Sequence, residues 1–298
     1  MNKWYEKEAV KVNRIIKSAT PELTDLKITN WCSNACRFCY QGSNIDGKHA
    51  DIYDIFHVID VLSDNECFEI SLAGGDVVSH PYFLTILQYI KDKNMTPNFT
   101  TRMGYSGRWM RDDFIKETVI RYCGGVAFSV GDLYDYNNLM KVIKEYNFPK
   151  EKVVIHLTMG VVSEKDYINI LTFCAINKIQ VTLLGFKETE HNKDFKNALD
   201  YKDKKLYNEY NEWWLSNLMF LKNGSSGIYK VGIDTKMVQD FEDDLRKYNI
   251  SEVLWTKEEG KFSCYIDVVE KIIAPSSYNG EKIKYNDENE LMEIYAKF

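Results

Sequence analysis

The sequence has 298 residues, 45% of them hydrophobic and 28% charged, with a formal net charge of −6. This is ordinary globular composition, and the negative charge argues against sequence-independent binding of nucleic acid, which needs clustered Lys and Arg side chains. No apolar run approaches the roughly 20 residues that span a bilayer, and the first residues lack the apolar core of a signal peptide, so we expect a cytoplasmic protein without membrane contact.

Short β-branched or aromatic runs alternate along the chain with segments whose apolar residues recur at helical spacing. In chain order the pattern predicts a helix at 3–18, a strand at 26–29, a helix at 51–62, a strand at 68–72, a helix opening at Pro81, strands at 97–101 and 126–130, a helix at 137–146, a strand at 153–158, a helix at 165–177, a strand at 179–184, a helix at 205–221, a strand at 228–233, a helix at 236–248 and a final strand or hairpin at 262–273.

This alternation predicts right-handed crossovers and a parallel sheet. We therefore expect an α/β fold, a partial or nearly complete TIM-like barrel whose chemistry lies at the carboxyl ends of the strands. An N-terminal helical extension over 1–23 would precede a barrel core over 24–187. Residues 188–298 would complete the barrel and determine the substrate, and the highly charged segment 188–205 is expected to be a mobile loop.

Three of the seven cysteines, Cys32, Cys36 and Cys39, lie in one short loop after the first predicted strand. In a chain without an export signal, such clustering favours metal ligation over disulfides. Structural zinc prefers four protein ligands, and no second cysteine pair or histidine pair lies nearby. A four-iron cubane with three cysteine ligands instead leaves one iron open to an external ligand.

The Cys-x-x-x-Cys-x-aromatic-Cys motif, with Phe38 before its last cysteine, resembles the signature of the radical S-adenosylmethionine (radical SAM) superfamily. The resemblance implies that Cys32, Cys36 and Cys39 hold a [4Fe-4S] cluster and that S-adenosylmethionine (SAM) chelates the open iron. Reductive cleavage of SAM would give a 5′-deoxyadenosyl radical that abstracts hydrogen from a peptide or small-molecule substrate. An electron donor such as a flavodoxin or ferredoxin is implied as a partner.

The resemblance also implies contacts to SAM from the ends of several strands: Phe38, Gly74, Gly75, Asp76, Ser129, Leu184 and Gly185. Gly74–Asp76 stands where the family carries Gly-Gly-Glu, and it is implied to hold the methionine amino group, with the glycines allowing close backbone approach. Ser129 is implied to contact the ribose, and Leu184 with Gly185 to flank the adenine beside Phe38.

Four further residues have less specific interpretations. Arg102 and Lys187 are expected to point into the mouth of the barrel, where each would pair with a cofactor or substrate carboxylate, although solvated surface charge is the alternative. We interpret His156 as a core histidine and Cys264 as a buried, inert thiol. The sequence assigns no catalytic side chain.

Two functions outside catalysis remain open at this point. One is an iron–sulfur electron carrier or redox sensor, and the other is a zinc-stabilised binding module. The resemblance covers about residues 24–187, and the remaining C-terminal part cannot be assigned to a subfamily, so the sequence leaves the substrate open.

Overall fold

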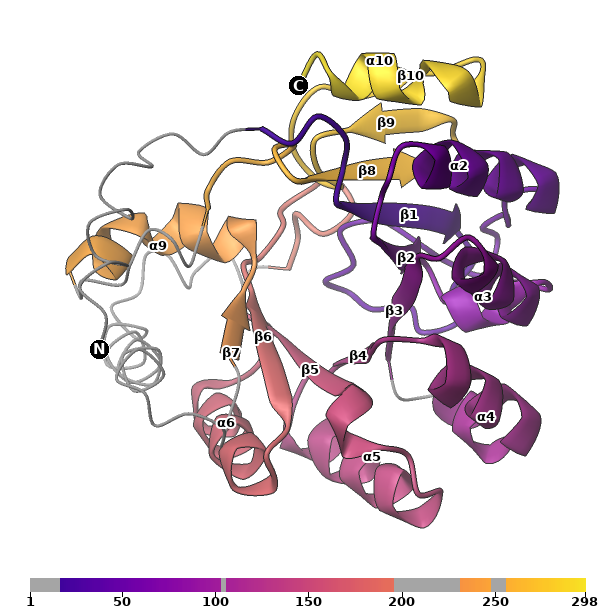
Figure 1. Cartoon of the computed structure of the whole chain (residues 1–298). Helices are drawn as coiled ribbons and strands as arrows, with labels where there is room; N and C mark the ends of the chain where they lie inside the picture. Colours follow the sequence, from indigo (N-terminus) through magenta and orange to yellow (C-terminus); the bar gives the residue numbers. More distant parts are fainter. Residues whose placement is uncertain (1–16, 103–105, 196–230, 248–255) are drawn as a thin grey trace, which may run out of the picture.

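The computed structural model describes residues 17–102, 106–195, 231–247 and 256–298, which form one ten-stranded sheet with helices on its outer side (Figure 1). The strands are β1 (Leu23–Thr29), β2 (Glu69–Gly74), β3 (Thr96–Arg102), β4 (Val126–Ser129), β5 (Val153–Thr158), β6 (Gln180–Leu184), β7 (Val231–Ile233), β8 (Ser263–Asp267), β9 (Ile272–Ala274) and β10 (Ile283–Lys284). The helices are α2 (Ile52–Asp64), α3 (Phe83–Asp92), α4 (Asp113–Tyr122), α5 (Leu133–Glu145), α6 (Glu164–Asn177), α9 (Thr235–Lys247) and α10 (Leu291–Tyr295).

The strand order is β10-β9-β8-β1-β2-β3-β4-β5-β6-β7. All pairs from β8 to β7 are parallel, whereas β9 and β10 continue the sheet antiparallel. Within the described residues β7 and β10 are the two edges, so the sheet does not close. This confirms the predicted α/β class and a partial barrel, with the expected C-terminal hairpin formed by β8 and β9.

The predicted elements are confirmed wherever the structure describes them. Asp51 caps α2 by accepting a hydrogen bond from the Tyr53 amide, and α3 begins at Phe83, two residues after Pro81. The predicted helix at 205–221, nearly all of the one at 3–18 and the first half of the strand at 228–233 lie outside the described residues. Two helices were not predicted: α4 buries only Val119 fully, which leaves no clear apolar stripe, and α10 has only five residues.

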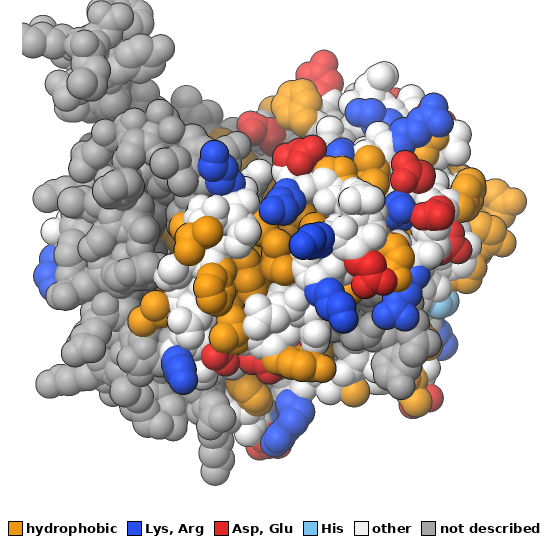
Figure 2. All heavy atoms as spheres, turned by 90° about the horizontal axis from the view of Figure 1, so that it is seen from below, with side chains coloured by type: hydrophobic (Ala, Val, Ile, Leu, Met, Phe, Trp, Pro, Cys, Tyr) orange, Lys and Arg blue, Asp and Glu red, His pale blue; other side chains and the backbone are white. Residues whose placement is uncertain are grey.

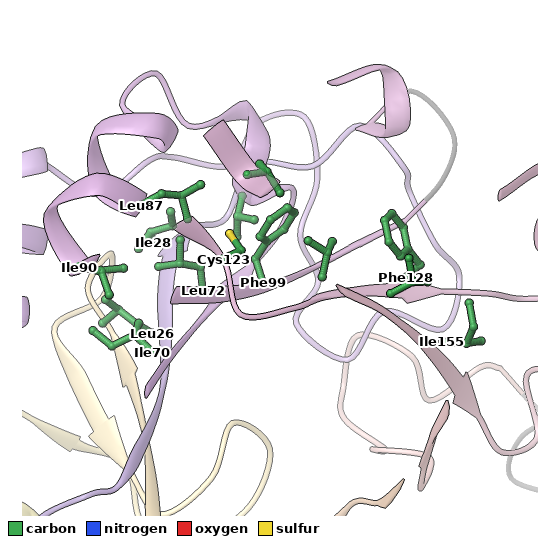
Figure 3. Close-up of a cluster of buried hydrophobic side chains, with 14 of the residues drawn as sticks. Leu26, Ile28, Ile70, Leu72, Leu87, Ile90, Phe99, Cys123, Phe128 and Ile155 are labelled. Atoms are coloured by element: carbon green, nitrogen blue, oxygen red, sulfur yellow. The ribbon is translucent and has the colours of Figure 1, made fainter. Parts of the chain in front are cut away.

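Side chains alternate between the two faces of the parallel strands. The outward-facing residues are apolar and pack beneath the helices, and Figure 3 shows Leu26, Ile28, Ile70 and Leu72 beside Leu87 and Ile90 of α3, with Phe128 and Ile155 farther along the sheet. The intervening residues face the interior and are mostly polar: Asp25, Ser71, Thr100, Ser129, His156 and Thr158 line a cavity. The core therefore lies between sheet and helices, and the inside of the partial barrel is a polar surface.

Charges of both signs are distributed over the surface. On the face seen in Figure 2, Lys and Arg side chains are interspersed with Asp and Glu, and apolar side chains gather near its centre. This face carries no continuous basic stripe of the kind that follows a phosphate backbone. In the described part of the chain, every helix is too short or too polar to cross a membrane.

Candidate active site

One cavity of about 370 Å³ brings together all the predicted ligands and cofactor contacts. It is lined by the three clustered cysteines, Cys32, Cys36 and Cys39, and by all seven residues predicted to contact SAM: Phe38, Gly74, Gly75, Asp76, Ser129, Leu184 and Gly185. Because these residues follow or end β1, β2, β4 and β6, the cavity lies at the carboxyl ends of the parallel strands. The predicted site residues therefore share one location.

The three cysteines lie on a loop between β1 and α2 and are free, half-buried thiols. The loop is fixed by backbone hydrogen bonds, from the Cys32 amide to the Asn44 carbonyl at 2.8 Å and from the Cys39 amide to the Cys36 carbonyl at 3.0 Å. No group of three His, Cys, Asp or Glu side chains among the described residues is arranged to hold a single metal ion. A cubane cluster binds each cysteine to a different iron, so this spread-out thiol set fits a cluster better than one zinc ion.

Gly74 and Gly75 allow the end of β2 to pack against the cysteine loop. Gly74 has a φ of 122°, and a Cβ at this position would lie 2.2 Å from the Thr29 carbonyl oxygen. A Cβ on Gly75 would lie 2.0 Å from the Trp31 carbonyl oxygen and 3.1 Å from the Cys32 Cβ. From the sequence, we expected these glycines to let the cofactor approach the backbone closely. In the structure, it is the backbone at Thr29 and Trp31 that lies close to them.

Asp76 follows this glycine pair and is buried, with 6% of its surface exposed. Its Oδ1 atom has no hydrogen-bond partner among the described residues. Burial raises the pKa of the carboxyl to about 6, although a hydrogen bond from the Val78 amide opposes the shift. A cationic donor placed beside Asp76 would satisfy the oxygen and stabilise the carboxylate, so the residue fits contact with an amino group.

Arg102, at the end of β3, points into the cavity as expected. Its Nη1 donates to the Cys36 sulfur at 3.1 Å, and its Nη2 pairs with the Asp135 carboxylate at 3.0 Å. The guanidinium also lies over the Phe38 ring, 5.1 Å from its centroid. Arg102 thus places positive charge at Cys36 and contacts Phe38, the aromatic residue of the motif.

The segment after β6 holds the cysteine loop from outside. Asn192 is 2% exposed, and its Nδ2 donates to the carbonyls of Phe38, at 3.1 Å, and Lys187, at 2.9 Å. The Thr189 hydroxyl donates to the Tyr40 carbonyl at 2.8 Å, and its amide donates to Asn192 Oδ1 at 2.8 Å. The described part of the segment predicted as a mobile loop, residues 188–195, is thus attached to the cysteine loop by hydrogen bonds from Thr189 and Asn192. The charged composition of the segment gave no sign of these contacts.

Lys187 also lies in the cavity wall. Its Nζ is 5.3 Å from the centroid of the Tyr40 ring, 5.0 Å from that of Tyr278 and 3.7 Å from Asp234 Oδ2. The nearby phenol and carboxyl groups raise the pKa of Lys187 despite its burial. The carboxylate that the structure pairs with Lys187 is the protein's own Asp234, whereas the expected partner was a carboxylate of a cofactor or substrate.

His156 lies on the interior face of β5 and lines the cavity, so its interpretation as a core histidine was wrong. Burial, assisted by the charge of Lys187, lowers its pKa to about 4, which keeps the imidazole neutral. Cys264 is 2% exposed, and burial raises its pKa to about 12, which confirms a buried, protonated thiol. Gly185 permits close packing of α9, because a Cβ there would lie 2.8 Å from the Met237 amide nitrogen.

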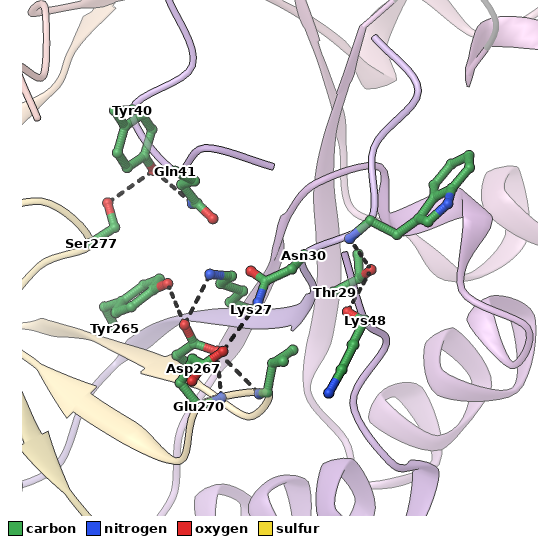
Figure 4. A network of polar contacts seen from close by, with 12 residues as sticks. Lys27, Thr29, Asn30, Tyr40, Gln41, Lys48, Tyr265, Asp267, Glu270 and Ser277 are labelled. Carbon is green, nitrogen blue, oxygen red and sulfur yellow. Dashed lines mark hydrogen bonds and ion pairs between the residues drawn. The ribbon is translucent and has the colours of Figure 1, made fainter. Parts of the chain in front are cut away.

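A second, larger cavity of about 730 Å³ adjoins the first and shares Tyr40, Gln41, Tyr265 and Ser277 with it. Its wall contains a buried ion pair between Lys27 and Asp267 at 3.0 Å (Figure 4). The Tyr265 hydroxyl donates to Asp267 Oδ2 at 3.3 Å, and the Tyr40 hydroxyl lies 3.0 Å from Ser277 Oγ. The cysteine loop is thus connected to the segment after β9, and β1 to β8, around a polar opening.

Comparisons with known proteins agree with this arrangement. The sequence profile described as "Radical SAM superfamily" matches residues 26–119. The structure of Streptococcus suis SuiB bound to S-adenosylmethionine is similar with a TM-score of 0.66 and 15% identity, over 93% of this chain and 66% of SuiB. SuiB bound to the precursor peptide SuiA gives a TM-score of 0.64 at 15% identity, over 99% of this chain and 70% of SuiB.

The structure of anSMEcpe with bound AdoMet and the Cp18Cys peptide is similar with a TM-score of 0.58 and 11% identity, over 92% of this chain and 80% of that one. A search of curated protein sequences finds no match. This chain spans about two thirds of the length of SuiB, and the structural similarities show a shared fold. The profile covers the cysteine motif and the Gly-Gly-Asp segment, so residues 26–119 match the radical SAM superfamily, and the fold of the chain is the partial barrel seen in these structures.

Proposed function

We propose that Cys32, Cys36 and Cys39 hold a [4Fe-4S] cluster and that the 370 Å³ cavity binds SAM against it. When bound, these groups supply one-electron cleavage of SAM to a 5′-deoxyadenosyl radical that abstracts hydrogen from a peptide or small-molecule substrate. The observation that carries this proposal is that three free thiols and the seven residues predicted to contact SAM line a single cavity. An electron carrier without catalysis would have no need of the cavity beside its cluster.

The residues of the chain have distinct tasks in this proposal. Asp76 accepts hydrogen bonds from the amino group of SAM, because its buried Oδ1 has no partner among the described residues. Ser129 offers its hydroxyl to the ribose, and Phe38 with Leu184 provides apolar surface for the adenine. Arg102 orients Cys36 and Phe38 through the contacts described above.

A peptide substrate is supported by the peptide-bound structures of SuiB and anSMEcpe, which share the fold. The C-terminal region over 188–298 supplies Asp234, Tyr265 and Ser277 to the cavity, which supports its proposed role in determining the substrate. We propose a flavodoxin or ferredoxin as the electron donor, because cleavage consumes an electron that the chain itself does not supply.

The proposal is tested by metal content and cofactor affinity. Anaerobically reconstituted protein should contain about four irons, the number in a cubane cluster. Asp76→Ala should keep this iron but bind SAM at least roughly tenfold more weakly, since a charged hydrogen bond in a buried site is lost. Asp64→Ala, at an exposed position in the last turn of α2, is the matched control and should bind SAM like the wild type. Stoichiometric zinc in place of iron, or unchanged SAM affinity in Asp76→Ala, would contradict the proposal.

A further inference from the structure

Asp25 occupies a position on the floor of the cavity that the proposed SAM contacts do not use. It lies on the interior face of β1, opposite Ser71 of β2 in the parallel register, and it lines the same cavity as the cysteines. The Ser71 hydroxyl donates to the carboxylate, and Lys187 acts on it only through space. Within the described residues, no Lys, Arg or His forms an ion pair with Asp25 inside 4.0 Å.

The groups around Asp25 leave negative charge in excess. Asp234 and Glu259 add two carboxylates, and Lys187 is the cation that acts on these two and on Asp25. Glu69, which accepts a hydrogen bond from the Asn98 side chain, adds a further negative charge. Burial of His156 keeps its imidazole neutral, as its lowered pKa indicates, so it adds no positive charge. The surroundings of Asp25 therefore hold more carboxylates than cations, and burial, together with nearby like charges, raises the pKa of Asp25, Asp234 and Glu259.

The Asp234 and Glu259 carboxylates are already held by the protein. Asp234 Oδ1 accepts hydrogen bonds from the amides of Gly185, at 2.9 Å, and Met237, at 2.8 Å, and its Oδ2 lies 3.7 Å from Lys187 Nζ. Glu259 accepts a hydrogen bond from the Tyr278 hydroxyl at 3.1 Å. Asp25 and Asp234 both line the cavity, but only Asp234 has an ion-pair partner inside 4.0 Å among the described residues, and Asp25 has the Ser71 hydroxyl as its hydrogen-bond donor.

We propose that Asp25 is a specificity-determining residue that binds a protonated amine or guanidinium group of the substrate. This inference rests on the proposed function, because it assigns the cavity floor to the substrate and the cysteine side to SAM. The adjoining 730 Å³ cavity, joined to the first through Tyr40 and Tyr265, provides space for the rest of the substrate. The substrate is thus a basic peptide side chain or a small amine, and not an acidic molecule.

Binding measurements on iron-loaded protein saturated with SAM, without reductant, test this inference. Calorimetry would compare Nα-acetyl-lysine amide with Nα-acetyl-norleucine amide as peptide probes, and n-butylamine with n-butanol as free small molecules. The wild type should bind the charged member of at least one pair roughly tenfold more tightly, and whichever pair shows the preference identifies the source of the cation. Asp25→Asn should bind both members of that pair within about twofold of each other.

Asp64→Asn makes the same carboxylate-to-amide substitution at an exposed position of α2. This variant should bind the charged probe more tightly than the neutral one, as the wild type does. Equal or absent binding of charged and neutral probes by the wild type, or a preference that persists in Asp25→Asn, would overturn the inference. Iron content and SAM affinity are measured on the same samples. A wild type that contains no iron or does not bind SAM would contradict the proposed function. A wild type that contains iron and binds SAM but does not discriminate between the probes would contradict the role of Asp25 alone.

Discussion

Removal of the Asn192 side chain should loosen the cysteine loop from outside the cavity. Asn192→Ala deletes three buried hydrogen bonds, two donated to the Phe38 and Lys187 carbonyls and one accepted from the Thr189 amide. At roughly 1 kcal/mol each, these bonds contribute about 3 kcal/mol to holding the loop closed. A loss of this size corresponds to local opening that is on the order of 100-fold more frequent.

Amide hydrogen exchange followed by mass spectrometry measures this opening directly. The Cys39 amide, which donates to the Cys36 carbonyl, should exchange about 100-fold faster in Asn192→Ala than in the wild type, as expected from that loss. Asn177→Ala is the matched control, because it removes one bond from an asparagine amide to the Phe173 carbonyl on α6. Equal exchange of residues 36–41 in Asn192→Ala and the wild type would refute the clamping role of Asn192.

Two further predictions concern the interior face of the sheet. Lys27→Met leaves the buried Asp267 carboxylate without its ion-pair partner and should lower the free energy of unfolding in urea by about 3–5 kcal/mol, whereas an unchanged unfolding midpoint would contradict a buried pair. The folded-state pKa of His156 is about 4 against its ordinary value of 6.5, so the unfolded chain binds the proton first and stability is lost as the pH falls from 6.5 to 4. His156→Gln should flatten that part of the stability curve, and a curve of unchanged slope would show that His156 is not buried and neutral.

Local sequence patterns were sufficient to predict the barrel. The stripe at Phe83, Ile86, Leu87 and Ile90 predicted the buried face of α3 because its apolar residues recur at helical spacing. The same reasoning missed α4, whose neighbours contact it over a narrow surface around Val119. The cysteine spacing and the strand ends likewise placed the expected site residues in one cavity, since carboxyl ends of parallel strands meet at one edge.

Contacts between distant segments could not be predicted in this way. Asn192 lies 154 positions from Phe38 in the sequence, and an asparagine in a charged segment is typical of a solvated loop. Asp25 lies one residue before the predicted strand at 26–29 and seven residues before the cysteine motif, and only the structure shows that it lines the cavity opposite Ser71. The roles of Gly74 and Gly75 also depended on the backbone of the neighbouring strand and loop.

The central claim, that the three cysteines and the cavity beside them support cleavage of SAM, is tested most directly by product formation. Anaerobic, iron-loaded wild-type protein with SAM and dithionite should form 5′-deoxyadenosine, measured by chromatography, and Cys36→Ala should form none because a cubane with two cysteine ligands is lost or displaced. Equal amounts of 5′-deoxyadenosine from both proteins, or none from fully iron-loaded wild type with several reductants, would contradict the account.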